Sequence, residues 1–382
     1  MTLRRCALWA LLAAKLAGGW GVGWDIRWHV LIGRDSFWIA PHVLTYAAVT
    51  ASVLVALGVL LAETWRARRG APPLPGAIRI AGLTGTPGFH VAWWGAALIV
   101  LAAPIDDLWH RLFGIDVTLW SPPHLLGFAG SQVATLGGLL IALEVYPPGR
   151  RRWAALATGG TLLLGTFYFV VDPSIQTAFR RGGVFFFTHA VLGSLIFGFT
   201  LVLVARLAGR RSAPVVLTVG ALAVQLTIFA VGDLGFALTR PTPAVREAIA
   251  ADPGSPIAIA HEMARRSGTT PGRSLRLRLI PLLPAALMAL ADPLRRWPLA
   301  ALVFGLGMLA ASGGALGRSP ALAHALPALM DVLVALVLAP LAALAGGWAG
   351  ARLGARLAPE EAALKSGWDE ARPGRARGAA TA

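Results

Sequence analysis

The chain has 382 residues, of which 56% are hydrophobic and only 14% are Asp, Glu, Lys or Arg, and its mean hydropathy is +0.67. Soluble folds carry roughly 25% charged residues, and disordered chains are poor in apolar residues, so the composition excludes both classes. The formal net charge of +16 reflects 34 basic against 18 acidic residues. The bases lie in short clusters between apolar runs, which is typical of membrane loops and excludes a nucleic-acid partner.

Apolar runs follow one another along the chain, each near the roughly 20 residues that cross a bilayer. The predicted fold is therefore an all-α polytopic membrane protein with about ten transmembrane helices. We interpret the first run as an uncleaved helix, with a signal peptide as the alternative. The predicted spans are residues 1–24, 39–62, 89–105, 124–143, 153–171, 184–205, 214–238, 279–294, 297–313 and 324–347.

Arginine clusters orient these spans. If both termini are cytoplasmic, the clusters after alternate helices all fall on the cytoplasmic side, as the positive-inside rule requires. The location that follows is the bacterial inner membrane. Residues 239–278 become a polar, proline-containing extracytoplasmic loop, with a short helix around 255–266, that caps the bundle. The predicted organisation is a six-helix repeat region (1–210), a four-helix region (211–350) and a basic cytoplasmic tail (351–382).

An internal repeat carries most of the polar chemistry. Residues 24–43 read WDIRWHVLIGRDSFWIAPHV, and residues 105–125 read IDDLWHRLFGIDVTLWSPPHL. With one residue inserted, the two segments share Asp, Trp, His, Gly, Asp, Pro and His in the same order. A weaker third copy has Asp172 and His189 at the separation of Asp25 and His42. The first six helices are therefore expected to form three helix hairpins in the same orientation.

The spacing within each copy points to a metal site. Asp and His four residues apart share one helix face, and a turn at Gly33 or Gly114 brings back a second His at the start of the next helix. Two His and one carboxylate suit copper, iron or zinc and leave a position open for water, dioxygen or substrate. The predicted ligands, all on the extracytoplasmic side, are Asp25, His29, His42, Asp106, His110 and His124.

Further polar residues on the same side are predicted to act as auxiliaries. They would orient the ligand imidazoles, shuttle protons or line the same cavity. These residues are Asp35, Asp107, Asp116, Asp172, His189, Asp233, His324 and Asp331.

A purely structural interpretation of the repeat stays open. Its aspartates would pair with nearby arginines, namely Asp25 with Arg27, Asp35 with Arg34 and Asp116 with Arg111, and its tryptophans would form an interfacial belt. Lys15 in the first helix is expected to snorkel or pair and is assigned no role. The glycine run of that helix, beginning at Gly18, indicates close helix packing.

The Asp-x3-His-x12-His spacing of Asp25, His29 and His42 resembles the metal-ligand motif in the C subunit of copper membrane monooxygenases, the particulate methane and ammonia monooxygenases. The second copy matches with one residue inserted. In that family, an Asp and two His at the ends of membrane helices bind copper at or near the oxygen-activating site. The resemblance covers only the two repeat segments; it favours copper and implies further membrane subunits.

The leading hypothesis is an integral membrane metalloprotein that acts as a copper- or iron-dependent oxidoreductase on a small apolar or lipid-soluble substrate, its metal activating dioxygen or water. Its partners would be the bilayer, that substrate and other membrane subunits. A second hypothesis is a metal transporter or a metal-delivery or assembly factor, with Asp233, Asp331 and Lys15 along the path. A third is a b-type haem protein with axial histidines. The sequence leaves open whether the protein is an enzyme.

Overall fold

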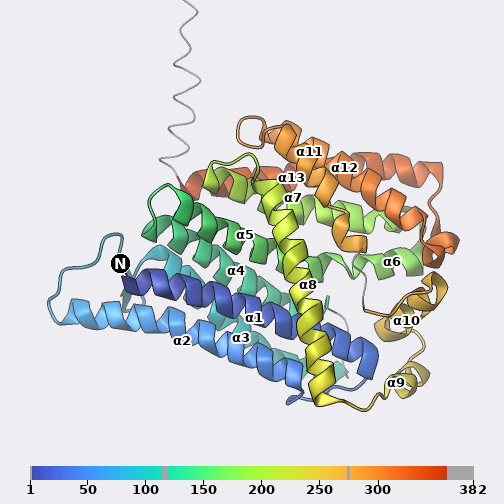
Figure 1. Ribbon diagram of the computed structural model, residues 1–382, viewed down its shortest axis with the longest axis horizontal. Coiled ribbons are helices and arrows are strands. Elements are labelled where there is room, and N and C mark those ends of the chain that lie inside the picture. The colour runs from blue at the N-terminus through green and yellow to red at the C-terminus, as the bar shows by residue number, and fades with distance from the viewer. Residues whose placement is uncertain (1, 114–118, 273–275, 359–382) are drawn as a thin grey trace, which may run out of the picture.

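A computed structural model describes residues 2–113, 119–272 and 276–358, with the side chains of His110 and Arg276 outside the description. Within this part the fold is helical apart from one short β-hairpin (Figure 1). Nine segments of it are long and apolar enough to cross a bilayer. Their long helices are α1 (Thr2–Ile32), α2 (Ala40–Arg68), α3 (Pro87–Phe113), α4 (Pro122–Val145), α5 (Arg150–Val171), α7 (Thr188–Ala208), α8 (Ala213–Thr239), α12 (Trp297–Gly317) and α13 (Leu329–Leu357).

Short elements connect the long helices. The antiparallel pair β1–β2 follows α2 and is the one departure from the predicted all-α class among the described residues. The short elements are β1 (Ile78–Ile80), β2 (Leu83–Gly85), α6 (Ser174–Arg181), η1 (Gly183–Phe187), α9 (Val245–Ala251), α10 (Pro256–Ser267), η2 (Arg276–Leu279), α11 (Leu282–Leu290) and η3 (Pro320–Ala325).

The predicted span at 279–294 is wrong in length. It is instead the nine-residue helix α11, which at 1.5 Å per residue is roughly 14 Å long and cannot cross a hydrocarbon core of about 30 Å alone. Pro281, at the N-cap, lacks a backbone N–H, and Asp292 has a positive φ of 60° just beyond the helix. Helical geometry is therefore interrupted at both ends, which leaves nine long helices rather than ten in the described ranges.

The surface of the bundle is apolar. Leu54 on α2 is 65% exposed, Val219 on α8 is 49% exposed and Val337 on α13 is 57% exposed, and many other large apolar side chains on the long helices are also exposed. Such large apolar surfaces are rare on soluble monomers, and in a bilayer they are covered by lipid chains. The chain is therefore an integral multi-pass membrane protein embedded in a bilayer.

Consecutive long helices form packed pairs: α1 lies on α2, α3 on α4, and α5 on α7. Small residues bring some helices very close, as membrane bundles require. On α13, a Cβ added at Gly346 would overlap the backbone carbonyl of Leu195 on α7. The core between the helices is filled mainly by Leu, Ala, Val and Phe side chains.

Residues 33–39 connect α1 to α2 at one end of the bundle. At this end α9 and α10 lie beside the end of α1 (Figure 1). The Ala244 N–H donates to the Ile32 carbonyl at 2.7 Å, and His261 Nε2 lies 2.7 Å from the Val30 carbonyl oxygen. The predicted short helix around residues 255–266 is thus confirmed, as α10.

The opposite end is held by a buried ion pair and by hydrogen bonds to a carboxylate and to the backbone. Arg4 forms a bidentate pair with Glu63, and Glu144 accepts hydrogen bonds from the Thr86 hydroxyl and, at 2.8 Å, the Gly88 N–H. Arg5 Nε donates to the Val145 carbonyl. Which side of the membrane this end faces stays a prediction from the arginine distribution.

Candidate metal centre

The first repeat copy adopts the predicted hairpin. Asp25 and His29 lie one turn apart on α1, and Gly33 ends the helix with a φ of +74°, a conformation that favours glycine. Asp35 follows in the loop. The helix α2 then begins at Ala40 with Pro41 in its first turn, and His42 comes next.

Two imidazoles and two carboxylates meet at this hairpin. His42 Nε2 lies 3.1 Å from Asp25 Oδ1 and 3.8 Å from Asp35 Oδ1. His29 Nε2 lies 3.4 Å from Asp35 Oδ2, and His29 Nδ1 lies 3.4 Å from Asp25 Oδ1. All four side chains are largely buried, with exposed fractions of 17–23%. We call these four residues the Asp/His cluster.

The other nitrogen of each ring faces the backbone. His29 Nδ1 lies 3.0 Å from the Asp25 carbonyl oxygen, and His42 Nδ1 lies 3.1 Å from the Ser36 carbonyl oxygen. A carbonyl oxygen only accepts, so each Nδ1 carries the proton and donates. In a neutral ring the lone pair is then on Nε2, which is directed at a carboxylate.

Asp35 stays ionised in this setting. Burial alone would raise the pKa of its carboxyl, but the hydrogen bond from His29 and the charges of His29 and His42 outweigh burial and hold the pKa below its ordinary value of 3.8. The Asp35 carboxylate is therefore available as an anion at the cluster.

This lowered pKa gives a stability prediction. A lowered folded-state pKa contributes stability that is present above pH 3.8 and is lost as the pH falls through the folded value. Acidification from about pH 5 to pH 3 should therefore lower the thermal unfolding midpoint less in Asp35→Asn than in wild type. Asp107→Asn, at an exposed carboxylate paired with Arg111, serves as the control. Equal acid sensitivity of wild type and Asp35→Asn would contradict the assignment.

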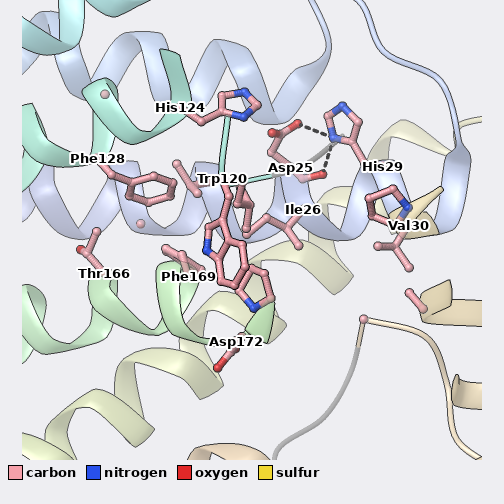
Figure 2. Close-up of a pocket in the computed structure, with 18 of the residues that line it drawn as sticks. Asp25, Ile26, His29, Val30, Trp120, His124, Phe128, Thr166, Phe169 and Asp172 are labelled. Atoms are coloured by element: carbon pink, nitrogen blue, oxygen red, sulfur yellow. Dashed lines mark hydrogen bonds and ion pairs between the residues drawn. The ribbon is translucent and has the colours of Figure 1, made fainter. Parts of the chain in front are cut away.

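The cluster lies on a large cavity of about 1400 Å³. The helices α1, α2, α3 and α4 line one part of it, and residues of α5, α6, α10, α12 and η3 line the rest. Figure 2 shows Asp25 and His29 with His124 at one side of the pocket, next to Trp120 and Phe128. His124 Nε2 lies 3.5 Å from Asp106 Oδ1, and both residues line the cavity. The two repeat copies thus face one cavity.

Part of the second copy falls outside the described part of the chain. This part comprises the side chain of His110 and residues 114–118, which include the predicted turn residue Gly114 and Asp116.

The third copy is arranged differently. The Asp172 carboxylate pairs with Arg278 at 2.5 Å, whereas His189 is fully buried with its Nδ1 3.1 Å from the Ser312 hydroxyl. Asp172 lines the same cavity, but His189 is not among the described lining residues. This copy therefore supplies an ion pair to the cavity wall rather than an Asp–His pair.

The remaining auxiliary candidates have other contacts. Asp107 pairs with Arg111 at 2.7 Å, and Asp233 pairs with Arg27 at 2.6 Å. His324 Nδ1 lies 3.0 Å from Arg266 Nη1. Asp331 accepts the Ala328 N–H at 2.9 Å as a helix cap. Of these, only Asp107 lines the cavity in the described residues, so the predicted cavity roles of Asp233, His324 and Asp331 are not supported.

The structural interpretation of the repeat also fails in part. Arg27 pairs with Asp233 rather than Asp25, and Arg34 donates to the Thr242 carbonyl rather than to Asp35. Trp24 and Trp28 are 7% and 8% exposed and pack on Phe236, so they are core residues and not an interfacial belt. Burial against α8 outweighs their preference for the membrane surface.

Across the described ranges, no group of three or more His, Cys, Asp and Glu side chains already stands in an arrangement that could hold a metal ion. The side chains of the Asp/His cluster are instead in direct contact with one another.

The structure adds cavity residues that the motifs did not indicate. Tyr46, one turn after His42, lines the cavity with its ring 5.9 Å from the His42 ring. Lys15 also lines it, on the same face of α1 as Asp25 and His29. The sequence could have indicated that Lys15 lines the cavity, because Lys15 stands at helical spacing from Val22, Asp25 and His29.

Comparisons with known proteins give no relative for this chain. No protein-family model, no curated protein and no solved structure matches it.

Proposed function

We propose that the Asp/His cluster binds one transition-metal ion at the mouth of the cavity and that the protein is a membrane metalloprotein acting on a lipid-soluble substrate. The single observation that carries this proposal is the orientation of the two imidazoles. His29 and His42 each have Nδ1 near a backbone carbonyl and Nε2 directed at a carboxylate, and His29 Nδ1 also lies 3.4 Å from the Asp25 carboxylate.

That orientation favours a cation. A lone pair on Nε2 that faces a carboxylate is repelled, and the repulsion is relieved by a proton on the ring or by a metal ion between the groups. Histidines that bind metals usually donate their other ring N–H to a backbone carbonyl or carboxylate, which fixes the tautomer. Both rings of the cluster follow this pattern.

The spacing is also close to what an ion needs. Ligands 2.0–2.2 Å from a tetrahedral ion lie roughly 3.3–3.6 Å apart. The nitrogen–oxygen separations here are 3.1, 3.4 and 3.8 Å. Small rotations of the four side chains would make room for an ion between them. The Asp/His cluster therefore has to open slightly when it binds the ion.

The ion and the chemistry follow from the donors. Two imidazoles and two carboxylates suit zinc, iron and copper, and the resemblance of the repeat to copper membrane monooxygenases favours copper. Such an ion supplies Lewis-acid or redox chemistry when bound. The transporter hypothesis loses support because Asp233 and Asp331, its expected path residues, pair with Arg27 and cap α13.

Metal titration tests the proposal. Purified protein is stripped with a chelator and titrated separately with Cu(II), Zn(II) and Fe(II). Wild type should bind one ion per chain at the cluster, and His42→Ala should bind it at least tenfold more weakly. His324→Ala, at an exposed histidine that contacts Arg266, should bind like wild type. Equal binding by wild type and His42→Ala would contradict the proposal.

A further inference from the structure

Lys15 is a basic residue in the middle of the bundle that the metal site does not use. Its Nζ lies 2.5 Å from the Ser131 hydroxyl, 3.2 Å from Gln132 Oε1 and 3.3 Å from the Ser131 carbonyl oxygen, all on or along α4. Of the two expectations for Lys15, snorkelling or pairing, the hydrogen bonds to Ser131 and Gln132 favour pairing, because they hold the amine against α4.

All of these partners are neutral. Among the described residues, no carboxylate lies within ion-pairing distance of the Lys15 amine. Lys15 is half-buried, and an ammonium that is partly removed from water without a counter-ion is costly; in membrane interiors such groups usually mark a functional site. An anionic ligand group would supply the missing charge.

The cavity joins this amine to the Asp/His cluster. One face of α1 lines it continuously, through residues at helical spacing: Lys15, Gly18, Gly19, Val22, Asp25, Ile26 and His29. The ten residues from Lys15 to Asp25 rise roughly 15 Å along the helix. The floor between the two polar ends is apolar or lacks side chains.

The opposite wall combines apolar and small polar side chains. Ala48 and Val49 of α2 and Ala102 of α3 line the same space, together with Thr45 and Ser52 of α2. A Cβ added at Gly19 would meet no atom within 4 Å, so this glycine borders open volume rather than a packed helix. Gly18, Gly21 and Gly23 do pack, against Ala48, Thr45 and Ile228, so the predicted packing role of the glycine run fails only at Gly19.

The size argues against a very small substrate. At about 1400 Å³ the cavity exceeds the roughly 300–1,000 Å³ of most small-molecule pockets. The α1 face of the cavity has no polar side chain between the Lys15 amine at one end and the Asp/His cluster at the other, an arrangement that matches a single-chain amphiphile. A chain of roughly twelve carbons covers the 15 Å between the two ends.

We infer that the cavity binds a long-chain carboxylate, with its head on Lys15 and the far end of its chain at the Asp/His cluster. This inference rests on the proposed function only for the metal ion at the Asp/His cluster. The carboxylate site at Lys15 needs no metal. The part of the ligand presented to the cluster is then the end of the chain and not the carboxylate.

Binding of radiolabelled dodecanoate tests the inference. Wild type and variants are reconstituted in lipid nanodiscs after chelator treatment, and binding to empty nanodiscs is subtracted. Lys15→Met should bind dodecanoate about tenfold or more weakly, because a charge-assisted hydrogen bond is lost. Dodecanol, which has the chain without the charge, should bind wild type and Lys15→Met equally, and this also reports an intact cavity.

Steric variants complete the design. Gly19→Leu should block dodecanoate and dodecanol alike by filling the channel. Gly58→Leu, at an exposed α2 glycine that also has open space, should bind both like wild type. Equal dodecanoate binding by wild type and Lys15→Met, or by wild type and Gly19→Leu, would overturn the inference.

The same assay separates this inference from the metal proposal. His42→Ala should lose metal while it keeps dodecanoate. A chain that binds dodecanoate through Lys15 but takes up no metal would refute the metal site alone. A chain that binds metal but shows no Lys15-dependent dodecanoate binding would refute the carboxylate site alone.

Discussion

Replacing Arg4 with Met is expected to destabilise the protein by about 3–5 kcal/mol, because the substitution leaves a buried carboxylate without its partner. Arg4 and Glu63 have side-chain exposures of 2% and 4%. Their two hydrogen bonds measure 2.6 and 2.7 Å, and Arg4 Nη1 also donates to the Pro75 carbonyl at 2.9 Å. The pair ties α1 to α2 and to the loop that follows α2.

The matched control is the double variant Arg4→Met/Glu63→Leu. Replacing both members of a buried pair by apolar residues of similar size is often close to neutral, because no unpaired charge remains. The free energy of unfolding, measured by SDS titration in mixed micelles, should therefore fall sharply in Arg4→Met and recover in the double variant. A single variant within about 1 kcal/mol of wild type would show that the pair contributes little.

The second large effect is expected from Asp25→Asn. Asp25 Oδ1 is the one atom that contacts both imidazoles, at 3.4 Å from His29 and 3.1 Å from His42. An amide keeps the shape but removes the charge that attracts a cation. Metal affinity should therefore fall at least about 100-fold, since changes to groups that merely orient ligands already cost 10–100-fold.

Asp107→Asn is the control for this substitution. It makes the same chemical change in the second repeat copy, at a carboxylate that is 61% exposed and pairs with Arg111. Its metal affinity, measured by competition with a chelator of known affinity, should match that of wild type. If Asp25→Asn and Asp107→Asn bind equally well, Asp25 is not a ligand.

Much of the architecture could be predicted from the sequence, because in lipid the apolar runs must become helices. The hairpin of Asp25, His29 and His42 was also predictable, since helical spacing and a glycine at a turn are local properties. The turn at Gly33 was enough to predict that α2 returns beside α1. The repeat alone was therefore enough to predict this hairpin.

The span predicted at 279–294 failed for a local reason, the interruptions at Pro281 and Asp292. Other failures involve partners distant in sequence. Arg4 reads as a marker of membrane sidedness, but its pairing with Glu63 depends on how α1 packs on α2. Asp233 reads as a cavity residue, and only the crossing of α8 over α1 shows that it pairs with Arg27. Lys15 was assigned no role because its cavity is formed by many elements that are far apart in the sequence. Local patterns carry no information on such contacts.

Pulsed EPR of the protein loaded with one equivalent of Cu(II) tests the metal site most directly. A copper ion bound through Nε2 leaves a protonated remote Nδ1 on each ring, and that remote nitrogen modulates the electron spin echo. The account predicts modulation from two imidazoles in wild type and from one in each of His29→Ala and His42→Ala. Copper that fails to bind, or an imidazole modulation that is unchanged in both variants, would contradict the proposed centre.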